Sequence, residues 1–300
     1  MKSLIIKNIL LNIVRSSILI FIFLSVSVNA TEKKVKLEDL GEPAKIELKL
    51  YVFNCGEIEV RDLSVFNPAI PKGTVKTLSD ACYLIVHPNG MLFWDGGLPD
   101  DLVTQIGGAE VSNGLFKLSK SRTLKSQFEE IGVDPLSVDY IALSHLHFDH
   151  TGSANYFTNA KWLIQKSEFD IAFTPEGINI GFVPESYNLL QNNVQELQGH
   201  YDVFGDKSVV IISTPGHTPG HQALYINLPK TGKIILSGDL YHFKENRINY
   251  GIPDFNTSKR ETIHSFVLMD NLLDRLNATL WIQHDKPFFE SLNLSPSFYQ

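Results

Sequence analysis

The 300-residue sequence predicts an α/β fold in which helices cover the outer faces of sheets. Short apolar runs with strand character recur along most of the chain. Many of them are continuous, which is typical of strands buried on both faces. Residues 258–276 instead carry apolar side chains at helical spacing. The 43% apolar and 20% charged composition is that of an ordinary globular protein, and it excludes a disordered, collagenous or coiled-coil chain.

The expected strands follow one another from residue 50 onwards. Pro88-Asn89-Gly90 predicts a hairpin turn between two of them. The complete set is 50–53, 81–87, 91–95, 138–144, 161–165, 209–214, 222–228, 233–236 and 278–283.

Two helices are expected. One spans residues 123–131 and stops at Gly132, and the other spans 258–276, where Ser258 and Glu261 have the spacing of a capping box. The sequence after residue 45 contains no internal repeat, low-complexity tract or linker. We therefore predict one domain over residues 31–300.

The first thirty residues have the pattern of a secretory signal peptide. A basic, partly apolar lead precedes the apolar run 18–28, and Val28-Asn29-Ala30 offers small residues for cleavage. Eleven apolar residues as a helix span about 16 Å, roughly half of a bilayer core. We expect cleavage and export to the periplasm or medium, with no stable membrane insertion afterwards. An uncleaved membrane anchor is the alternative.

Charge and cysteine content exclude further classes. The chain has 26 basic and 33 acidic side chains, and no basic run offsets the negative balance, so a nucleic-acid substrate is not expected. Cys55 and Cys82 fall in apolar segments. They either pair in an oxidising compartment or remain buried and unpaired, and the unpaired state is at least as well supported. Neither lies in a CxxC pair, so a thiol redox or cysteine-zinc site has no support.

Histidines and aspartates cluster directly after predicted strands. Strand 138–144 is followed by His145, His147, Asp149 and His150, four potential metal ligands in six residues. Without a metal, such a cluster beside a buried strand would be costly to desolvate. In extended chain the first two histidines point the same way and can reach one ion, while the turn that follows can direct the other two to a second ion.

Three further elements repeat this design. His217 lies in a Gly- and Pro-rich loop after strand 209–214, Asp239 follows strand 233–236, and His284 ends strand 278–283. Neutral imidazoles and carboxylates suit zinc, although manganese, iron or cobalt also accept such ligands.

The run HLHFDH at 145–150 resembles the HxHxDH signature of the metallo-β-lactamase-fold hydrolases, and His217, Asp239 and His284 follow in that superfamily's order. The resemblance extends from about Ile46 to the end of the chain. It implies an αβ/βα four-layer sandwich with metals at one edge of the packed sheets.

Within this superfamily the chain is most similar to the N-acyl homoserine lactonases, which are quorum-quenching enzymes. The similar segments are NCGE (54–57), DLS (62–64), FWDGG (93–97), SHLHFDHTG (144–152), GHYD (199–202) and PGHTPGHQ (215–222). The resemblance assigns one metal to His145, His147 and His217, a second to Asp149, His150 and His284, and the bridging position to Asp239.

The mechanism implied by the resemblance is attack of a metal-bridging hydroxide on the lactone carbonyl. Asp149 is the candidate proton shuttle. These lactonases carry a tyrosine three residues after the bridging aspartate, whereas here Tyr241 comes two residues after Asp239 and His242 comes three. Tyr241 therefore reaches the substrate through a bulge, His242 takes its role, or the substrate differs.

Two other functional classes remain open. One is a hydrolase with the same ligands, such as a thioesterase of glyoxalase II type, an aryl esterase or a β-lactam hydrolase. The other is a non-catalytic lactone binder. The partner is in each case a small lactone or ester, and an oligomer is compatible with the sequence.

Three smaller expectations concern the surroundings of the site. His221 braces its loop by hydrogen bonding, and Asp285 either orients a ligand or is solvated. The apolar side chains between Phe169 and Val183 either line an acyl-chain pocket or pack in the core.

Overall fold

The computed structural model describes residues 34–42 and 46–300, which belong to one compact unit. The predicted signal segment 1–30 lies outside the described residues. No helix in the described part of the chain combines the length and the apolar character needed to cross a membrane.

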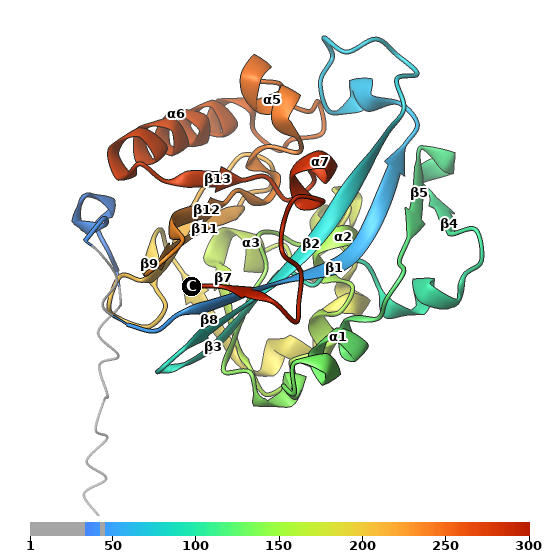
Figure 1. The fold of residues 1–300 in the computed structure, drawn as a ribbon. Helices are drawn as coiled ribbons and strands as arrows, with labels where there is room; N and C mark the ends of the chain where they lie inside the picture. The colour runs from blue at the N-terminus through green and yellow to red at the C-terminus, as the bar shows by residue number, and fades with distance from the viewer. Residues whose placement is uncertain (1–33, 43–45) are drawn as a thin grey trace, which may run out of the picture. The chain divides into compact units, whose positions relative to one another are not determined.

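Two β-sheets form the centre of this unit (Figure 1). The larger has the strand order β4-β5-β1-β2-β3-β6-β7-β8, with β14 also paired to β1, and the smaller has the order β13-β12-β11-β10-β9. The strands of the larger sheet are β1 (Lys49–Val60), β2 (Lys76–His87), β3 (Gly90–Trp94), β4 (Ala109–Val111), β5 (Phe116–Ser119), β6 (Tyr140–Ala142), β7 (Lys161–Gln165), β8 (Val194–Leu197) and β14 (Phe298–Tyr299). Those of the smaller sheet are β9 (Tyr201–Asp202), β10 (Val209–Ser213), β11 (Gln222–Leu228), β12 (Gly232–Leu236) and β13 (Thr279–Trp281).

The sheets pack face to face, and helices cover their outer sides. Side chains from β1, β2 and β3 meet those of β10, β11 and β12 in a shared core. Helix α6 (Lys259–Leu276) packs on the outer face of the smaller sheet, and α1 (Leu124–Glu130) packs on that of the larger (Figure 1). The predicted αβ/βα four-layer sandwich is therefore confirmed.

The remaining helices are short and connect strands. They are α2 (Phe148–Thr151), α3 (Lys166–Phe169), α4 (Pro175–Asn179), α5 (Lys244–Asn249) and α7 (Lys286–Phe289). Both predicted helices are present. The Ser258 side chain caps α6 by accepting from the backbone N–H of Glu261, as the capping-box spacing predicts.

All nine predicted strands occur, but β6 and β13 are shorter than expected, because the chain leaves the ladder early to form ligand-bearing loops. The strands that sequence analysis missed are β4, β5, β8, β9 and β14, each of two to four residues. Runs this short carry too few apolar positions to show a period.

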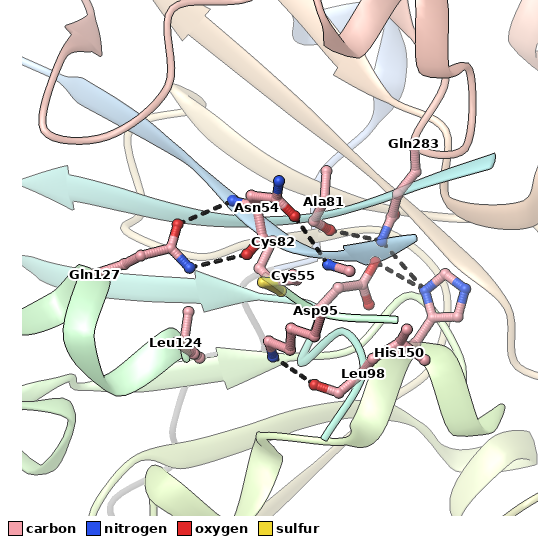
Figure 2. Close-up of a disulfide and its surroundings, with 12 residues drawn as sticks. Asn54, Cys55, Ala81, Cys82, Asp95, Leu98, Leu124, Gln127, His150 and Gln283 are labelled. Atoms are coloured by element: carbon pink, nitrogen blue, oxygen red, sulfur yellow. Dashed lines mark hydrogen bonds and ion pairs between the residues drawn. A yellow bond between two sulfur atoms is a disulfide. The ribbon is translucent and has the colours of Figure 1, made fainter. Parts of the chain in front are cut away.

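Cys55 and Cys82 form a disulfide, which is the first of the two alternatives that the sequence left open (Figure 2). They lie on the adjacent strands β1 and β2 with their Cα atoms 5.8 Å apart, which is within disulfide reach. The sequence shows their strand character but not that these two strands are neighbours.

Candidate metal centre

All seven predicted metal-ligating residues lie at one edge of the sandwich, just beyond strand ends. Residues 145–150 follow β6 and enter α2, and His217 lies between β10 and β11. Asp239 lies in the short 3-10 helix η9 (Gly238–Leu240) after β12, and His284 follows β13. Because β12 and β13 are parallel neighbours, their carboxyl ends deliver Asp239 and His284 to the same place.

One set of candidate ligand atoms, the first group, consists of His145, His147, His217 and Asp239. His145 Nε2 lies 2.8 Å from His147 Nδ1 and 3.1 Å from His217 Nε2. Asp239 Oδ2 is 3.7 Å from His145 Nε2 and 3.4 Å from His217 Nε2. Four tetrahedral ligands of a zinc ion lie roughly 3.3 Å apart, so these spacings suit one small cation.

The second group consists of Asp149, His150 and His284. The Nε2 atoms of the two histidines are 3.3 Å apart, and each lies 3.9 Å from an oxygen of Asp149. Asp239 Oδ1 lies 3.0 Å from His284 Nε2 and 3.3 Å from His150 Nε2. Asp239 therefore directs one oxygen to each group, which is the arrangement of a bridging carboxylate.

Four of the histidines have an oxygen acceptor at the ring nitrogen that faces away from the site. These contacts are His147 Nε2 to Ile180 O (2.8 Å), His217 Nδ1 to Asn256 Oδ1 (2.9 Å), His150 Nδ1 to Asp95 Oδ2 (3.2 Å) and His284 Nδ1 to Ser79 O (2.7 Å). A proton on each of these nitrogens leaves the inward nitrogen with a free lone pair. The donor set therefore fits divalent cations.

The electrostatics of the two groups differ. Burial lowers the pKa values of His145, His147 and His217, which keeps their rings neutral. Burial also acts to lower the pKa of His284, but the Asp239 carboxylate outweighs it and raises that pKa to about 9. A buried carboxylate that draws protons onto nearby imidazoles marks a place where bound cations would satisfy the same charge.

Glu168, which sequence analysis did not single out, ties two ligand loops together. It is buried on α3 and accepts from the backbone N–H of Leu146 at 3.1 Å and of Gly220 at 2.7 Å. Burial raises its pKa to about 7. Its sequence surroundings carry no motif, so only the fold reveals it.

His221 braces its loop, as expected. Its Nε2 accepts from the backbone N–H of Asp239 at 3.0 Å, and its Nδ1 lies 3.0 Å from the Thr214 carbonyl oxygen. Asp285 departs from both expectations, because it is a buried helix cap. It accepts from the N–H of Phe288 in α7 and from that of Lys244.

A cavity of about 330 Å³ opens onto both groups. Its polar end contains His147, Asp149, His217, Asp239, His242 and His284. Its apolar wall comes from segments far apart in the chain, namely Ile58, Val65, Phe66, Leu78, Leu115, Phe116, Phe148, Ile180 and Phe255.

The stretch 169–183 contributes little to this cavity, although it was a candidate acyl-chain pocket. Ile180 and Gly181 line the cavity, whereas Phe169 and Phe182 pack in the core with α1 and β7. Phe173, Ile178 and Val183 are exposed. The core-packing alternative therefore holds for Phe169 and Phe182, and neither alternative describes the exposed side chains.

The structure separates the two candidates for substrate contact. His242 lines the cavity with Nε2 3.2 Å from Asp239 Oδ2, and its ring lies 4.5 Å from that of Phe66. Tyr241 points the opposite way and stacks on Phe266 of α6 at 4.9 Å. The chain is extended at Tyr241, with no bulge that turns its side chain to the cavity, so the geometry favours His242 of the two candidates.

Comparisons with known proteins agree with this geometry. The chain is 32% identical over 225 residues to N-acyl homoserine lactonase AttM of Rhizobium radiobacter, covering 72% of this chain and 86% of that protein. It is 32% identical over 257 residues to N-acyl homoserine lactonase AiiA of Bacillus thuringiensis subsp. kurstaki, covering 83% and 98%.

Solved structures of quorum-quenching lactonases are also similar to this chain. A crystal structure of a quorum-quenching N-acyl homoserine lactone hydrolase superposes with a TM-score of 0.73 at 26% identity, covering 85% of this chain and 99% of that one. The dizinc quorum-quenching lactonase AidC shares the fold at a TM-score of 0.61 and 21% identity, covering 89% and 96%. Residues 77–276 match the family description of the metallo-beta-lactamase superfamily, and the chain belongs to that superfamily.

Proposed function

We propose that this protein is a dinuclear metal-dependent hydrolase that opens the ester ring of N-acyl homoserine lactones and so silences quorum signals. The observation that carries the proposal is Asp239, which directs one carboxylate oxygen to each group of ligand atoms at the end of a largely apolar cavity. The relatives named N-acyl homoserine lactonases support the substrate class.

His145, His147 and His217 would hold one cation, Asp149, His150 and His284 the other, and Asp239 both. The donor set of imidazoles and carboxylates supports zinc. Two bound cations supply a hydroxide nucleophile at neutral pH and polarise the substrate carbonyl.

The chain's own side chains supply proton transfer and orientation. Asp149 lies 3.9 Å from both His150 Nε2 and His284 Nε2, the loosest contacts in the second group, and it lines the cavity. Its carboxylate is placed to accept the proton of the attacking water and to return it to the leaving alkoxide as the ring C–O bond breaks. An N–H of His242 is placed to donate to the oxyanion that forms on the carbonyl oxygen.

The substrate class is tested by proton release from N-hexanoyl and N-decanoyl homoserine lactones, with a β-lactam, an aryl ester and a glutathione thioester as comparison substrates. We expect chelator-sensitive lactone opening with kcat/KM of about 10⁴ M⁻¹s⁻¹ or more, in the ordinary enzyme range. Faster turnover of a comparison substrate would reassign the chain to that hydrolase class. Stable lactone binding without turnover would make it a binder.

We also propose that the protein is exported. The Cys55–Cys82 disulfide supports this, because such bonds persist in oxidising compartments, and the signal-like pattern of residues 1–30 agrees with it. The mass of the protein recovered from its producing cells tests the proposal. A mature chain that begins at Thr31 in the periplasm or medium is expected, and a full-length cytoplasmic chain would contradict it.

A further inference from the structure

The Cys55–Cys82 disulfide crosses the point where the β1–β2 ladder is interrupted. The two strands pair along most of their length, so strand pairing itself does not depend on the bond. The register shifts between Asn54 and Gly56, and the N–H and carbonyl of Asn54 bond to the side chain of Gln127 in α1 (Figure 2). The covalent link therefore acts at the bulge that contains Cys55.

The loop of residues 95–98, which follows β3, lies directly on this disulfide. Gly97 has a φ of +56°, and a Cβ there would meet Cys55 Cβ at 2.2 Å and Cys82 Sγ at 2.9 Å. The next residue, Leu98, donates its backbone N–H to the Cys55 carbonyl at 3.1 Å. The disulfide is thus the surface on which the 95–98 loop rests, at a distance that only glycine permits.

The same loop holds His150 of the second group by its backbone and by its ring. Gly96 N–H donates to the His150 carbonyl at 2.6 Å, and Gly152 N–H donates to the Gly97 carbonyl at 2.7 Å. Asp95 Oδ2 lies 3.2 Å from His150 Nδ1 (Figure 2). A shift of the 95–98 loop would therefore move this candidate ligand.

The β2 side of the disulfide supports the other histidine of the second group. His284 Nδ1 lies 2.7 Å from the Ser79 carbonyl oxygen. Gln283 Nε2 donates to the carbonyl of Ala81, the residue before Cys82, and reaches 3.4 Å from His150 Nδ1 (Figure 2). The 95–98 loop, which rests on the disulfide, therefore contacts His150, and β2, which carries Cys82, contacts His284.

The first group depends on other segments. The outward ring nitrogen of His147 contacts the carbonyl oxygen of Ile180, and that of His217 contacts the side-chain oxygen of Asn256. Neither partner lies on β1, β2 or the 95–98 loop. His145 is connected to the 95–98 loop through its neighbour Ser144, whose N–H donates to Asp95 Oδ1 at 2.6 Å and whose hydroxyl lies 3.1 Å from His145 Nδ1. The contacts named here therefore reach both histidines of the second group and one of the three histidines of the first.

We propose that the Cys55–Cys82 disulfide is a positioning element for the second cation of the centre, acting through the 95–98 loop on His150 and through β2 on His284. This inference rests on the proposed two-cation function. It predicts that loss of the disulfide lowers the affinity of the protein for one cation and leaves its affinity for the other unchanged.

The test measures zinc bound per chain at a series of buffered free zinc concentrations, in wild type and in the double variant Cys55→Ala/Cys82→Ala. Wild type is expected to bind two ions. The variant is expected to keep the affinity of one ion and to bind the other roughly 10- to 100-fold more weakly, the usual effect of losing support behind a ligand.

Leu84→Ala is the matched control. Leu84 is buried on the same face of β2, two residues beyond Cys82, and belongs to the apolar cluster that includes Leu124 and Phe128 of α1, whereas Leu98 of the 95–98 loop belongs to another cluster. This variant should lower thermal stability yet leave both zinc affinities unchanged. The inference would be overturned if the double variant lost affinity for both ions equally, or for neither. Wild type that binds fewer than two ions would overturn the proposed function, and this inference with it.

Gly97→Ala supplies the test if the double variant does not fold. It keeps the disulfide and pushes the loop away from it, because the added Cβ lies 2.2 Å from Cys55 Cβ. The same selective loss of one ion is expected, and two wild-type affinities would again overturn the inference.

Discussion

Replacing Glu168 by glutamine should change how the stability of the metal-free protein depends on pH. Glu168 is buried between two ligand loops, and burial raises its pKa from the ordinary 4.5 to about 7. That difference corresponds to about 3 kcal/mol by which the ionised carboxylate disfavours the folded state.

The sign follows from which state ionises first. Well below pH 4.5 the Glu168 carboxyl is protonated in both the folded and the unfolded state, so its ionisation does not lower the free energy of unfolding. As the pH rises towards 7, the unfolded chain loses this proton before the folded chain does, so stability falls. Glutamine carries no charge at any pH, and the variant lacks this component of the pH dependence.

Urea unfolding of chelator-treated protein between pH 5 and 7.5 measures the effect. The free energy of unfolding of Glu168→Gln, taken relative to wild type, should rise by about 2 kcal/mol across this range. Glu129→Gln, at an exposed position on α1, is the control and should show no such rise. A difference between Glu168→Gln and wild type that stays constant with pH would refute the reasoning.

Three further predictions concern the centre and its frame. Asp239→Ala should weaken the binding of both cations and reduce lactone turnover by more than about 100-fold. Metal analysis and proton release check these effects, and a fully active variant would contradict the bridging assignment. His242→Phe should lower kcat by about 10²-fold while Tyr241→Phe leaves it unchanged, and the reverse pattern in steady-state kinetics would restore the tyrosine. The disulfide closes a sequence separation of 27 residues, so Cys55→Ala/Cys82→Ala should lose about 3.5 kcal/mol in urea unfolding, whereas an unchanged midpoint would show that the bond adds no stability.

The ligand set was predictable because its signal is local and repeated. Each of the seven residues follows an apolar strand, so the sequence already places them at strand ends. The structure brings the end of β6 in the larger sheet and the ends of β10, β12 and β13 in the smaller sheet to one edge of the sandwich. The α/β class followed from the same strands and from the capped helix α6, whereas the four-layer sandwich was implied by the resemblance to the superfamily.

The surroundings of the site were less predictable because they depend on packing between distant segments. Phe66, Phe116 and Phe255 meet in one cavity wall although loops and sheets separate them in the chain. Glu168 acts through backbone N–H groups of two other loops, which no side-chain motif records. Tyr241 and His242 are adjacent, and only the backbone beyond η9 decides which of them faces the cavity.

Two bound cations together should make the site active. Metal-free protein should be titrated with zinc while the opening of N-hexanoyl homoserine lactone is followed by proton release. Turnover should reach its maximum as the second equivalent of zinc binds, and further zinc should add nothing. Full activity at one equivalent, or turnover in the metal-free protein, would contradict a two-cation mechanism.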